Sequence, residues 1–135
     1  MRLVPVVALV LVAVDPSSIV LAQRSRQAPA TASSKAVNIV DVVGCLTEGT
    51  ANTWVLTNAS DPEVSTKPGA TAEEIKAAET KPLGKQRYGL IGLGLFEPAG
   101  HKGHKMAVKG LLIQDAKNTR INVTSFQMAG ATCAK

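Results

Sequence analysis

Aromatic residues are scarce in this chain of 135 residues, and so are histidine, cysteine and runs of like charge. Phe, Trp and Tyr together make up 3% of the sequence, so a core must be built mainly from Val, Leu, Ile and Ala. At about 25 cal/mol per Å² of buried apolar surface, such side chains suffice for one small domain with little margin. No five like charges follow one another, which excludes a long charged interaction tail.

Sequence motifs of catalysis are also missing. The serines stand in no Gly-x-Ser-x-Gly frame, and Gly89, Gly92 and Gly94 do not follow the dinucleotide-binding order. Glu73 and Glu74 are adjacent on a candidate helix, where neighbouring positions do not face each other. We therefore expect no enzymatic activity and no cofactor.

The only two histidines, His101 and His104, are weak candidates for a metal site. A His-x-x-His spacing can bind a metal, but a structural zinc site needs four ligands. The nearest acids, Glu97 and Asp115, have no motif spacing to the histidines. We expect exposed histidines in a polar turn and no metal. A small metal-dependent enzyme with a site assembled from distant residues is the least favoured alternative.

The N-terminal segment has the pattern of an export signal. One positive charge precedes an apolar run over residues 3–14, which is too short to span a bilayer because spanning takes about 20 apolar residues. Val20 and Ala22 match the small-residue pattern of a cleavage site. We expect a signal peptide over residues 1–22, no transmembrane anchor after cleavage, and a periplasmic or secreted protein. The alternative is an uncleaved apolar tail on a cytosolic protein.

Two cysteines, Cys45 and Cys133, lie near the two ends of the region that follows. Residues 23–36 lack an apolar period and are typical of a flexible linker, so we expect one domain over residues 37–135. Because thiols are oxidised outside the cytoplasm, export favours a disulfide between the two cysteines over a pair of buried free thiols. Such a bond requires the first and last strands to meet within about 7 Å between Cα atoms.

Alternating and β-branched segments predict five strands, over residues 37–46, 53–57, 88–91, 105–112 and 119–128. In the fourth, Met106 and Val108 are expected to face inward while Lys105 and Lys109 face outward. The inward set of the fifth shifts by one residue, which predicts a bulge near Thr124. We expect an all-β fold, a five-stranded OB-like Greek-key barrel, with a five-stranded sandwich fragment as the alternative.

Residues 61–87 interrupt the strand pattern, and Pro and Gly residues mark loops within them. Good helix formers cover residues 71–79, and Thr71 with Glu74 three positions later forms a capping-box pattern. The pattern predicts a short surface helix in a long, mobile insertion between two strands. A loop of this length is either functional or disordered, and both alternatives stay open.

The basic composition favours an anionic partner, because the formal net charge is +5 and the pI about 9.5. Trp54 and Tyr88, the latter beside Arg87, are the candidates for a ligand-binding surface on the second and third strands. We predict a monomeric, non-catalytic domain that binds a small ligand or a cell-envelope component there. The alternative is a basic OB-type binder of nucleic acid or acidic polysaccharide.

The order of motifs resembles that of small secreted bacterial proteins of unknown function with an OB-like barrel. In that group a Gly-Cys-Leu sequence opens the domain, a Gly-His-x-Val-x-Val-x-Gly strand lies late, and a cysteine ends it. Residues 44–46, residues 103–110 and Cys133 match these motifs, with Met106 in place of the first Val. The resemblance covers residues 37–135 and implies a secreted β-barrel with a disulfide. It implies no reaction.

Overall fold

The computed structural model describes residues 37–133, so the expected signal peptide (1–22) and linker (23–36) lie outside the described residues. Six strands form one mixed sheet, and one helix lies against it. The strands are β1 (Ile39–Glu48), β2 (Trp54–Ala59), β3 (Glu63–Ser65), β4 (Gln86–Ile91), β5 (Lys105–Gln114) and β6 (Thr119–Gly130). The helix is α1 (Ala72–Thr80), and short 3-10 turns are η1 (Thr50–Asn52), η2 (Leu93–Leu95) and η3 (Pro98–His101). All five predicted strands are present, and β3 is an addition.

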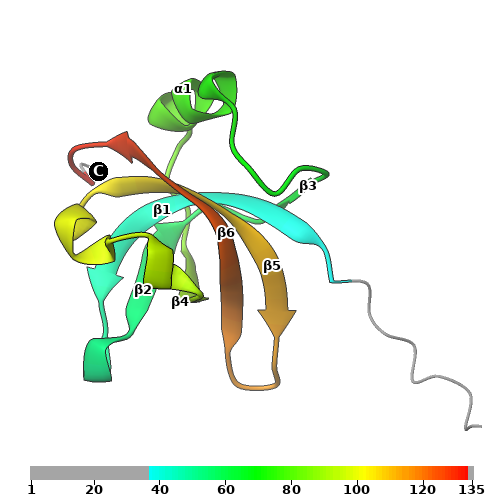
Figure 1. The fold of residues 1–135 in the computed structure, drawn as a ribbon, viewed down its shortest axis with the longest axis vertical. Helices are drawn as coiled ribbons and strands as arrows, with labels where there is room; N and C mark the ends of the chain where they lie inside the picture. The colour runs from blue at the N-terminus through cyan, green and yellow to red at the C-terminus, as the bar shows by residue number, and fades with distance from the viewer. Residues whose placement is uncertain (1–36, 134–135) are drawn as a thin grey trace, which may run out of the picture. The chain divides into compact units, whose positions relative to one another are not determined.

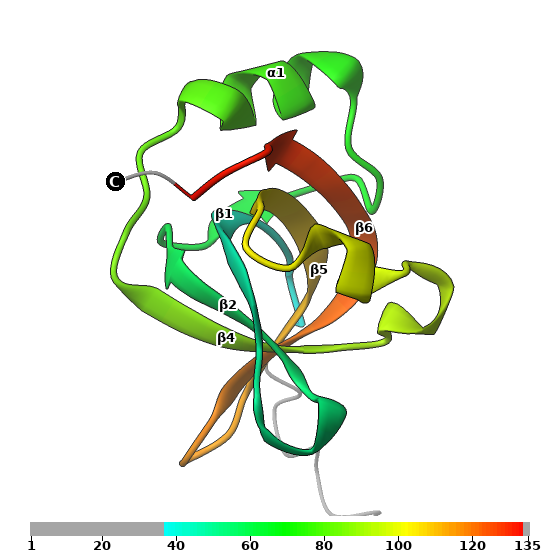
Figure 2. The same ribbon diagram turned by 90° about the vertical axis from the view of Figure 1, so that its left-hand side faces the viewer.

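Five of the strands close into a ring, in the order β1–β2–β4–β6–β5 and back to β1 (Figure 2). Every neighbouring pair in the ring is antiparallel except β4 and β6, which run parallel over Gly89–Ile91. The long strand β1 makes closure possible, because its first residues pair with β5 and its last residues pair with β2. Strand β3 stays outside the ring and pairs with the start of β1. The expected all-β character is confirmed.

The core fills the inside of the ring and is mainly aliphatic. Met106 and Val108 point into it as predicted, and both are fully buried. Burying a side chain of this size contributes about 1.5–3 kcal/mol relative to leaving it in water. Two aromatic side chains, Tyr88 and Phe126, complete the cluster.

A β-bulge interrupts the pairing of β5 with β6. Lys109 pairs with Ser125 and Gly110 pairs with Val123, which leaves Thr124 without a partner on β5. The predicted bulge near Thr124 is therefore confirmed. At this point the two strands approach closely, since a Cβ atom on Gly110 would lie 2.2 Å from the carbonyl oxygen of Asn122. Glycine is thus sterically required at position 110.

Helix α1 begins with the capping box that the sequence predicts. The Thr71 backbone N–H donates to Glu74 Oε2 at 2.7 Å, and the Glu74 backbone N–H donates to Thr71 Oγ1 at 3.3 Å. In Figure 1 the helix lies at the upper end of the ring, across β5 and β6, and the β5–β6 hairpin projects at the opposite end. Small side chains make the contact, because Ala78 packs with Val43, Ala107 and Ala129.

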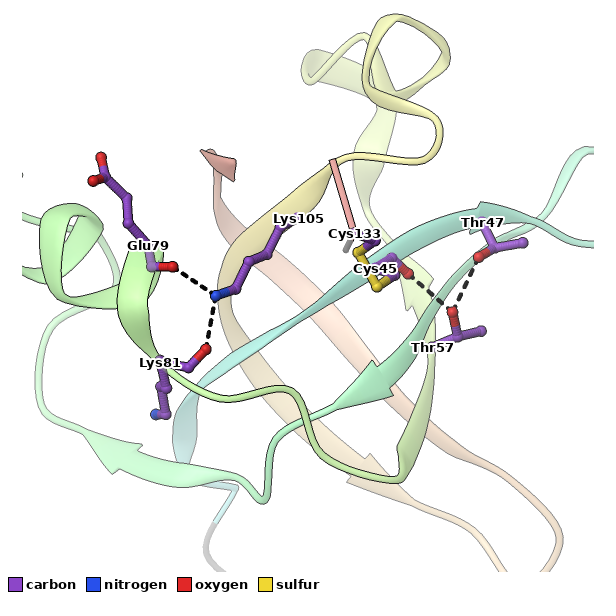
Figure 3. The surroundings of a disulfide bond; sticks show 7 residues. All are labelled: Cys45, Thr47, Thr57, Glu79, Lys81, Lys105 and Cys133. Carbon is purple, nitrogen blue, oxygen red and sulfur yellow. Dashed lines mark hydrogen bonds between the residues drawn. A yellow bond between two sulfur atoms is a disulfide. The ribbon is translucent and has the colours of Figure 1, made fainter. Parts of the chain in front are cut away.

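Two lysines of β5 hold the ends of the helical segment on the ring. At the start, Lys109 Nζ donates to Glu74 Oε1 at 2.7 Å. At the end, Lys105 Nζ donates to the carbonyl oxygens of Glu79 and Lys81, at 2.8 and 2.7 Å (Figure 3). Both lysines point out of the ring core as predicted, but the insertion covers them. The insertion is therefore anchored to the outer face of β5.

Candidate functional site

A cleft of about 510 Å³ lies on the outer side of the ring, where β2 and β4 meet the hairpin between β5 and β6. Strand β4 pairs with β2 on one side and with β6 on the other, so it lies between β2 and the β5–β6 hairpin (Figure 2). The lining residues are Thr53, Trp54, Val55, Arg87, Gly89, Leu90, Ile91, Lys117, Asn118, Thr119 and Arg120. The cleft is within the usual size range of small-molecule sites, about 300–1,000 Å³.

Two of the three residues that the sequence singled out for ligand binding meet in this cleft. Arg87 is exposed on β4. Trp54 begins β2 and pairs with Leu90 of β4, so its side chain lies on the core-facing side of the sheet. It is half-buried against the core and borders the cleft only with its exposed part. A half-buried indole has a fixed position and can report on a ligand that binds beside it.

Tyr88, the third candidate, faces the opposite side of β4. It is 4% exposed, it belongs to the core cluster, and its hydroxyl donates to the Ser60 carbonyl oxygen at 3.4 Å. Burial raises the pKa of the phenol, and the negative charge of Asp61 raises it further. The alternation of side chains along a strand explains the difference, since neighbouring residues 87 and 88 point to opposite faces. Tyr88 does not line the cleft.

The hairpin side of the cleft was not among the predicted site residues. Lys117, Asn118 and Arg120 come from the turn between β5 and β6 and from the start of β6. Arg120 lies across Gly89 of β4, since a Cβ atom on Gly89 would lie 3.2 Å from Arg120 Cγ. Its guanidinium group pairs with Asp115 at 2.5 Å. Only the parallel pairing of β4 with β6 places these residues beside Arg87.

The two histidines lie away from this cleft. Their rings meet edge-on with centroids 5.6 Å apart, and His101 also packs edge-on against Phe126 at 5.8 Å. The Nδ1 atoms of both histidines are buried and have no hydrogen-bond partner. Within residues 37–133, no group of three or more His, Cys, Asp and Glu residues could hold a metal ion. The expectation of exposed histidines is wrong, because both are half-buried, and the edge-on contact of His101 with Phe126 indicates a packing role in the turn before β5.

Cys45 and Cys133 form a disulfide, as the sequence predicted (Figure 3). Their Cα atoms are 5.7 Å apart, and the bond joins β1 to the segment that follows β6. Thr57 of the neighbouring strand β2 donates its hydroxyl to the Cys45 carbonyl oxygen at 3.3 Å. A disulfide of this kind indicates a non-reducing environment.

A second cluster of charged side chains lies under α1. Lys109 is the most deeply buried charge of the described residues, with a side chain 2% exposed. Besides the ion pair with Glu74, its ammonium group donates to Ser65 Oγ and to the Gly69 carbonyl oxygen, both at 3.2 Å. Asp41 lies directly opposite on β1. Burial raises the pKa of Asp41, although the positive charges of Lys109 and Lys81 partly oppose this rise.

This cluster has a structural explanation. All three hydrogens of the Lys109 ammonium group have acceptors, and these acceptors belong to the insertion that the lysine anchors. A buried ammonium group is tolerated only when it is paired and hydrogen-bonded. The hydrogen bond from Lys109 is also the main reason why the pKa of Glu74 lies below its ordinary value of 4.5.

The variant Glu74→Gln is expected to lower stability at neutral pH, because it leaves the buried Lys109 ammonium group without its ion-pair partner. A Gln at this position can keep the capping box through its side-chain oxygen, so the variant removes the charge and the acceptor that face Lys109 while the helix keeps its cap. Since folding lowers the pKa of Glu74, its contribution is fully present above about 4.5 and is lost as pH falls through the lower folded value. Folding raises the pKa of Asp41, so the contribution of Asp41 to stability decreases as pH rises from its ordinary pKa through the raised folded value, which is opposite to the effect of Glu74.

Urea unfolding between pH 7 and pH 3 checks this expectation. The stability of the unmodified protein falls below pH 4.5 more steeply than that of Glu74→Gln. Glu79→Gln is the matched control, because it removes the same charge from the same helix at an exposed position. Equal losses for Glu74→Gln and Glu79→Gln at neutral pH would contradict the proposed role of the ion pair.

The described part of the chain is thus a mostly β domain, with one mixed sheet closed into a ring, a disulfide and a basic cleft on the outer face. None of its helices is long and apolar enough to cross a membrane. Comparisons with family models, with curated proteins and with solved structures found no match to this chain.

Proposed function

We propose that this protein is an exported, non-catalytic binding domain that takes a small ligand or a cell-envelope component into the cleft between β2, β4 and the β5–β6 hairpin. The meeting of Trp54 with Arg87 and Lys117 in that cleft supports this function. No carboxylate, imidazole or thiol is among the lining residues. We propose a monomer with no cofactor.

The arrangement of the ring supports an OB-like Greek-key barrel as the finer description of the fold. The strands β5, β1, β2 and β4 are neighbours in this order, and each pair is antiparallel. Strand β5 is the fourth ring strand along the chain and lies beside the first, β1, which is the Greek-key order. OB-type barrels bind ligands on the face of their second and third strands and on adjoining loops. In this chain those strands are β2 and β4, and the cleft lies on them.

The same description agrees with the secreted OB-like group that the sequence resembles, and we propose membership of that group. The Cys45–Cys133 disulfide supports the proposed export, because disulfides persist in oxidising compartments. Periplasmic or secreted localisation then follows from cleavage of the proposed signal peptide over residues 1–22.

Ligand binding is tested with the protein purified from the periplasm and kept oxidised. Native mass spectrometry is expected to detect a bound molecule that denaturation releases. The only tryptophan of the chain lines the cleft, so ligand titration should change the Trp54 fluorescence. A ligand at 100 times its Kd raises the unfolding free energy by about 2.7 kcal/mol.

Two substitutions locate the binding surface. Arg87→Gln removes an exposed cation from the cleft, and Lys76→Gln removes an exposed cation from α1, at the other end of the ring. We expect weaker binding for Arg87→Gln and unchanged binding for Lys76→Gln. Failure to find a ligand by mass spectrometry and by fluorescence across a broad metabolite and glycan library would contradict the proposed function.

A further inference from the structure

The charge of the cleft has one sign. Its lining includes three basic side chains, Arg87, Lys117 and Arg120, and no acidic one. By contrast, the cleft beneath α1 is lined by Asp41, Glu63 and Glu74 together with Lys81. The two clefts therefore differ in the sign of the charge that their lining carries.

Two of the three cations in the cleft have no partner within the described residues. Arg87 and Lys117 make no hydrogen bond or ion pair there, and both are exposed. Arg120 is partly neutralised by its ion pair with Asp115. One unpaired positive charge thus remains on each side of the cleft, Arg87 on β4 and Lys117 on the β5–β6 hairpin. An anionic ligand would neutralise them without breaking an existing ion pair.

The rest of the lining is a mixture of neutral hydrogen-bonding groups and one aromatic side chain. Asn118 and Thr119 can donate to and accept from hydroxyl groups, whereas the Thr53 hydroxyl already donates to the Thr50 carbonyl oxygen at 2.7 Å and is left as an acceptor. Trp54 and Ile91 add an apolar surface, and part of the Trp54 side chain is fixed by the core. These groups suit a ligand that has hydroxyls, an apolar ring face and an anionic substituent.

We propose that the cleft binds a short acidic oligosaccharide, with Arg87 and Lys117 pairing with carboxylates of its sugars, the exposed part of Trp54 bordering a sugar ring, and Asn118 and Thr119 meeting hydroxyls. This inference rests on the proposed function and specifies its ligand. Arginine suits a carboxylate because its planar guanidinium group can donate two parallel hydrogen bonds. The turn between β1 and β2, which precedes Trp54, and the β5–β6 hairpin, which carries Lys117, lie at the same end of the ring (Figure 1).

Single-stranded nucleic acid fits this cleft less well. Proteins that bind it combine cations with several aromatic side chains on which successive bases stack. Trp54 is the only aromatic residue in the lining. Tyr88 is in the core, and Phe96 packs against Phe126 with ring centroids 5.9 Å apart. A single aromatic side chain can contact only one ring of a ligand, which suits a short oligosaccharide better than a series of stacked bases.

The test uses three probes of similar length, titrated against the oxidised protein at fixed salt with Trp54 fluorescence and calorimetry as readouts. The probes are a uronic-acid tetrasaccharide, the same tetrasaccharide with its carboxyl groups reduced to alcohols, and a single-stranded DNA tetramer. We expect the uronic-acid probe to bind at least tenfold more tightly than the reduced probe, since each hydrogen bond between charged groups contributes about a factor of ten or more. Added salt should weaken the binding of the acidic probe and leave that of the neutral probe unchanged.

Variants assign the two charges. Arg87→Gln and Lys117→Gln should each weaken binding of the acidic tetrasaccharide about tenfold and leave the reduced probe unaffected. Lys76→Gln, on the exposed face of α1, is the control with the same change in net charge. Circular dichroism melts verify folding of each variant.

The outcomes separate the ligand class from the binding function. Equal affinity for the acidic and the reduced tetrasaccharide overturns the acidic class but leaves a binding cleft in place. Tighter binding of the DNA tetramer also overturns it and identifies a nucleic-acid site. Equal effects of Arg87→Gln and Lys76→Gln would show that only overall charge matters, and that the cleft is not the site. If no probe binds and the broad library also yields no ligand, the proposed function fails as well.

Discussion

Removal of the Cys45–Cys133 disulfide is expected to lower the free energy of unfolding by about 3–5 kcal/mol. The two cysteines are 88 positions apart, so the bond closes a loop that includes nearly all of the ring. Breaking it restores conformational freedom mainly to the unfolded chain, because the strands on either side remain paired in the folded state. For a domain of this size, such a loss corresponds to a fall in Tm of at least about 12 °C.

Calorimetric melts of the oxidised protein, the reduced protein and a Cys45→Ala/Cys133→Ala double variant measure this effect. Alanine is chosen because Cys45 is buried and a serine hydroxyl there would need a new hydrogen-bond partner. The double variant should melt with the reduced protein and should not respond to reductant. Oxidised and reduced samples that melt alike would contradict the stabilising role of the bond.

The variant Gly110→Ala is expected to cost about 3 kcal/mol or more, at the upper end of what one extra methyl group costs in a packed core. The new Cβ would lie 2.2 Å from the Asn122 carbonyl oxygen and 2.6 Å from Ile121 Cγ2. The first of these atoms belongs to the backbone of β6, so the clash is relieved only when the two strands separate beside the bulge. Separation there weakens the most extensive strand pairing of the ring.

Gly94→Ala is the matched control for this substitution. Gly94 lies in η2, and a Cβ atom there would have no neighbour within 4 Å. Urea unfolding of both variants should show a large loss for Gly110→Ala and little change for Gly94→Ala. If the two variants unfold at the same urea concentration, the close approach of β5 to β6 does not limit stability.

The features that the sequence predicted correctly depend on short-range patterns. Alternation located the five ring strands, the shift of the inward set located the bulge at Thr124, and Thr71 with Glu74 located the start of α1. Each of these signals is contained in about ten neighbouring residues, where side-chain direction and capping follow from local geometry. The disulfide was predicted from the expected export of the protein, and its pairing was fixed because the chain has only two cysteines.

The features that the sequence did not predict depend on contacts between distant segments. Alternation indicates that Lys109 faces out of the core, but it does not show that residues 65–74 return to cover it. The cleft is a similar case. Arg87 was identified because it stands beside Tyr88, whereas Lys117 joins the same site only through the parallel pairing of β4 with β6. Parallel strands are not joined by a short hairpin turn, so no local turn sequence predicts their pairing.

The position of β3 outside the ring bears on how the protein behaves at high concentration. Strand β3 pairs with β1 on one side and has an open edge on the other. Open edges invite pairing between molecules and hence aggregation. This edge is only three residues long, follows Pro62 and includes the charged Glu63. A short, charged edge next to proline is a poor template for fibril growth, so the open edge of β3 adds little tendency toward self-association.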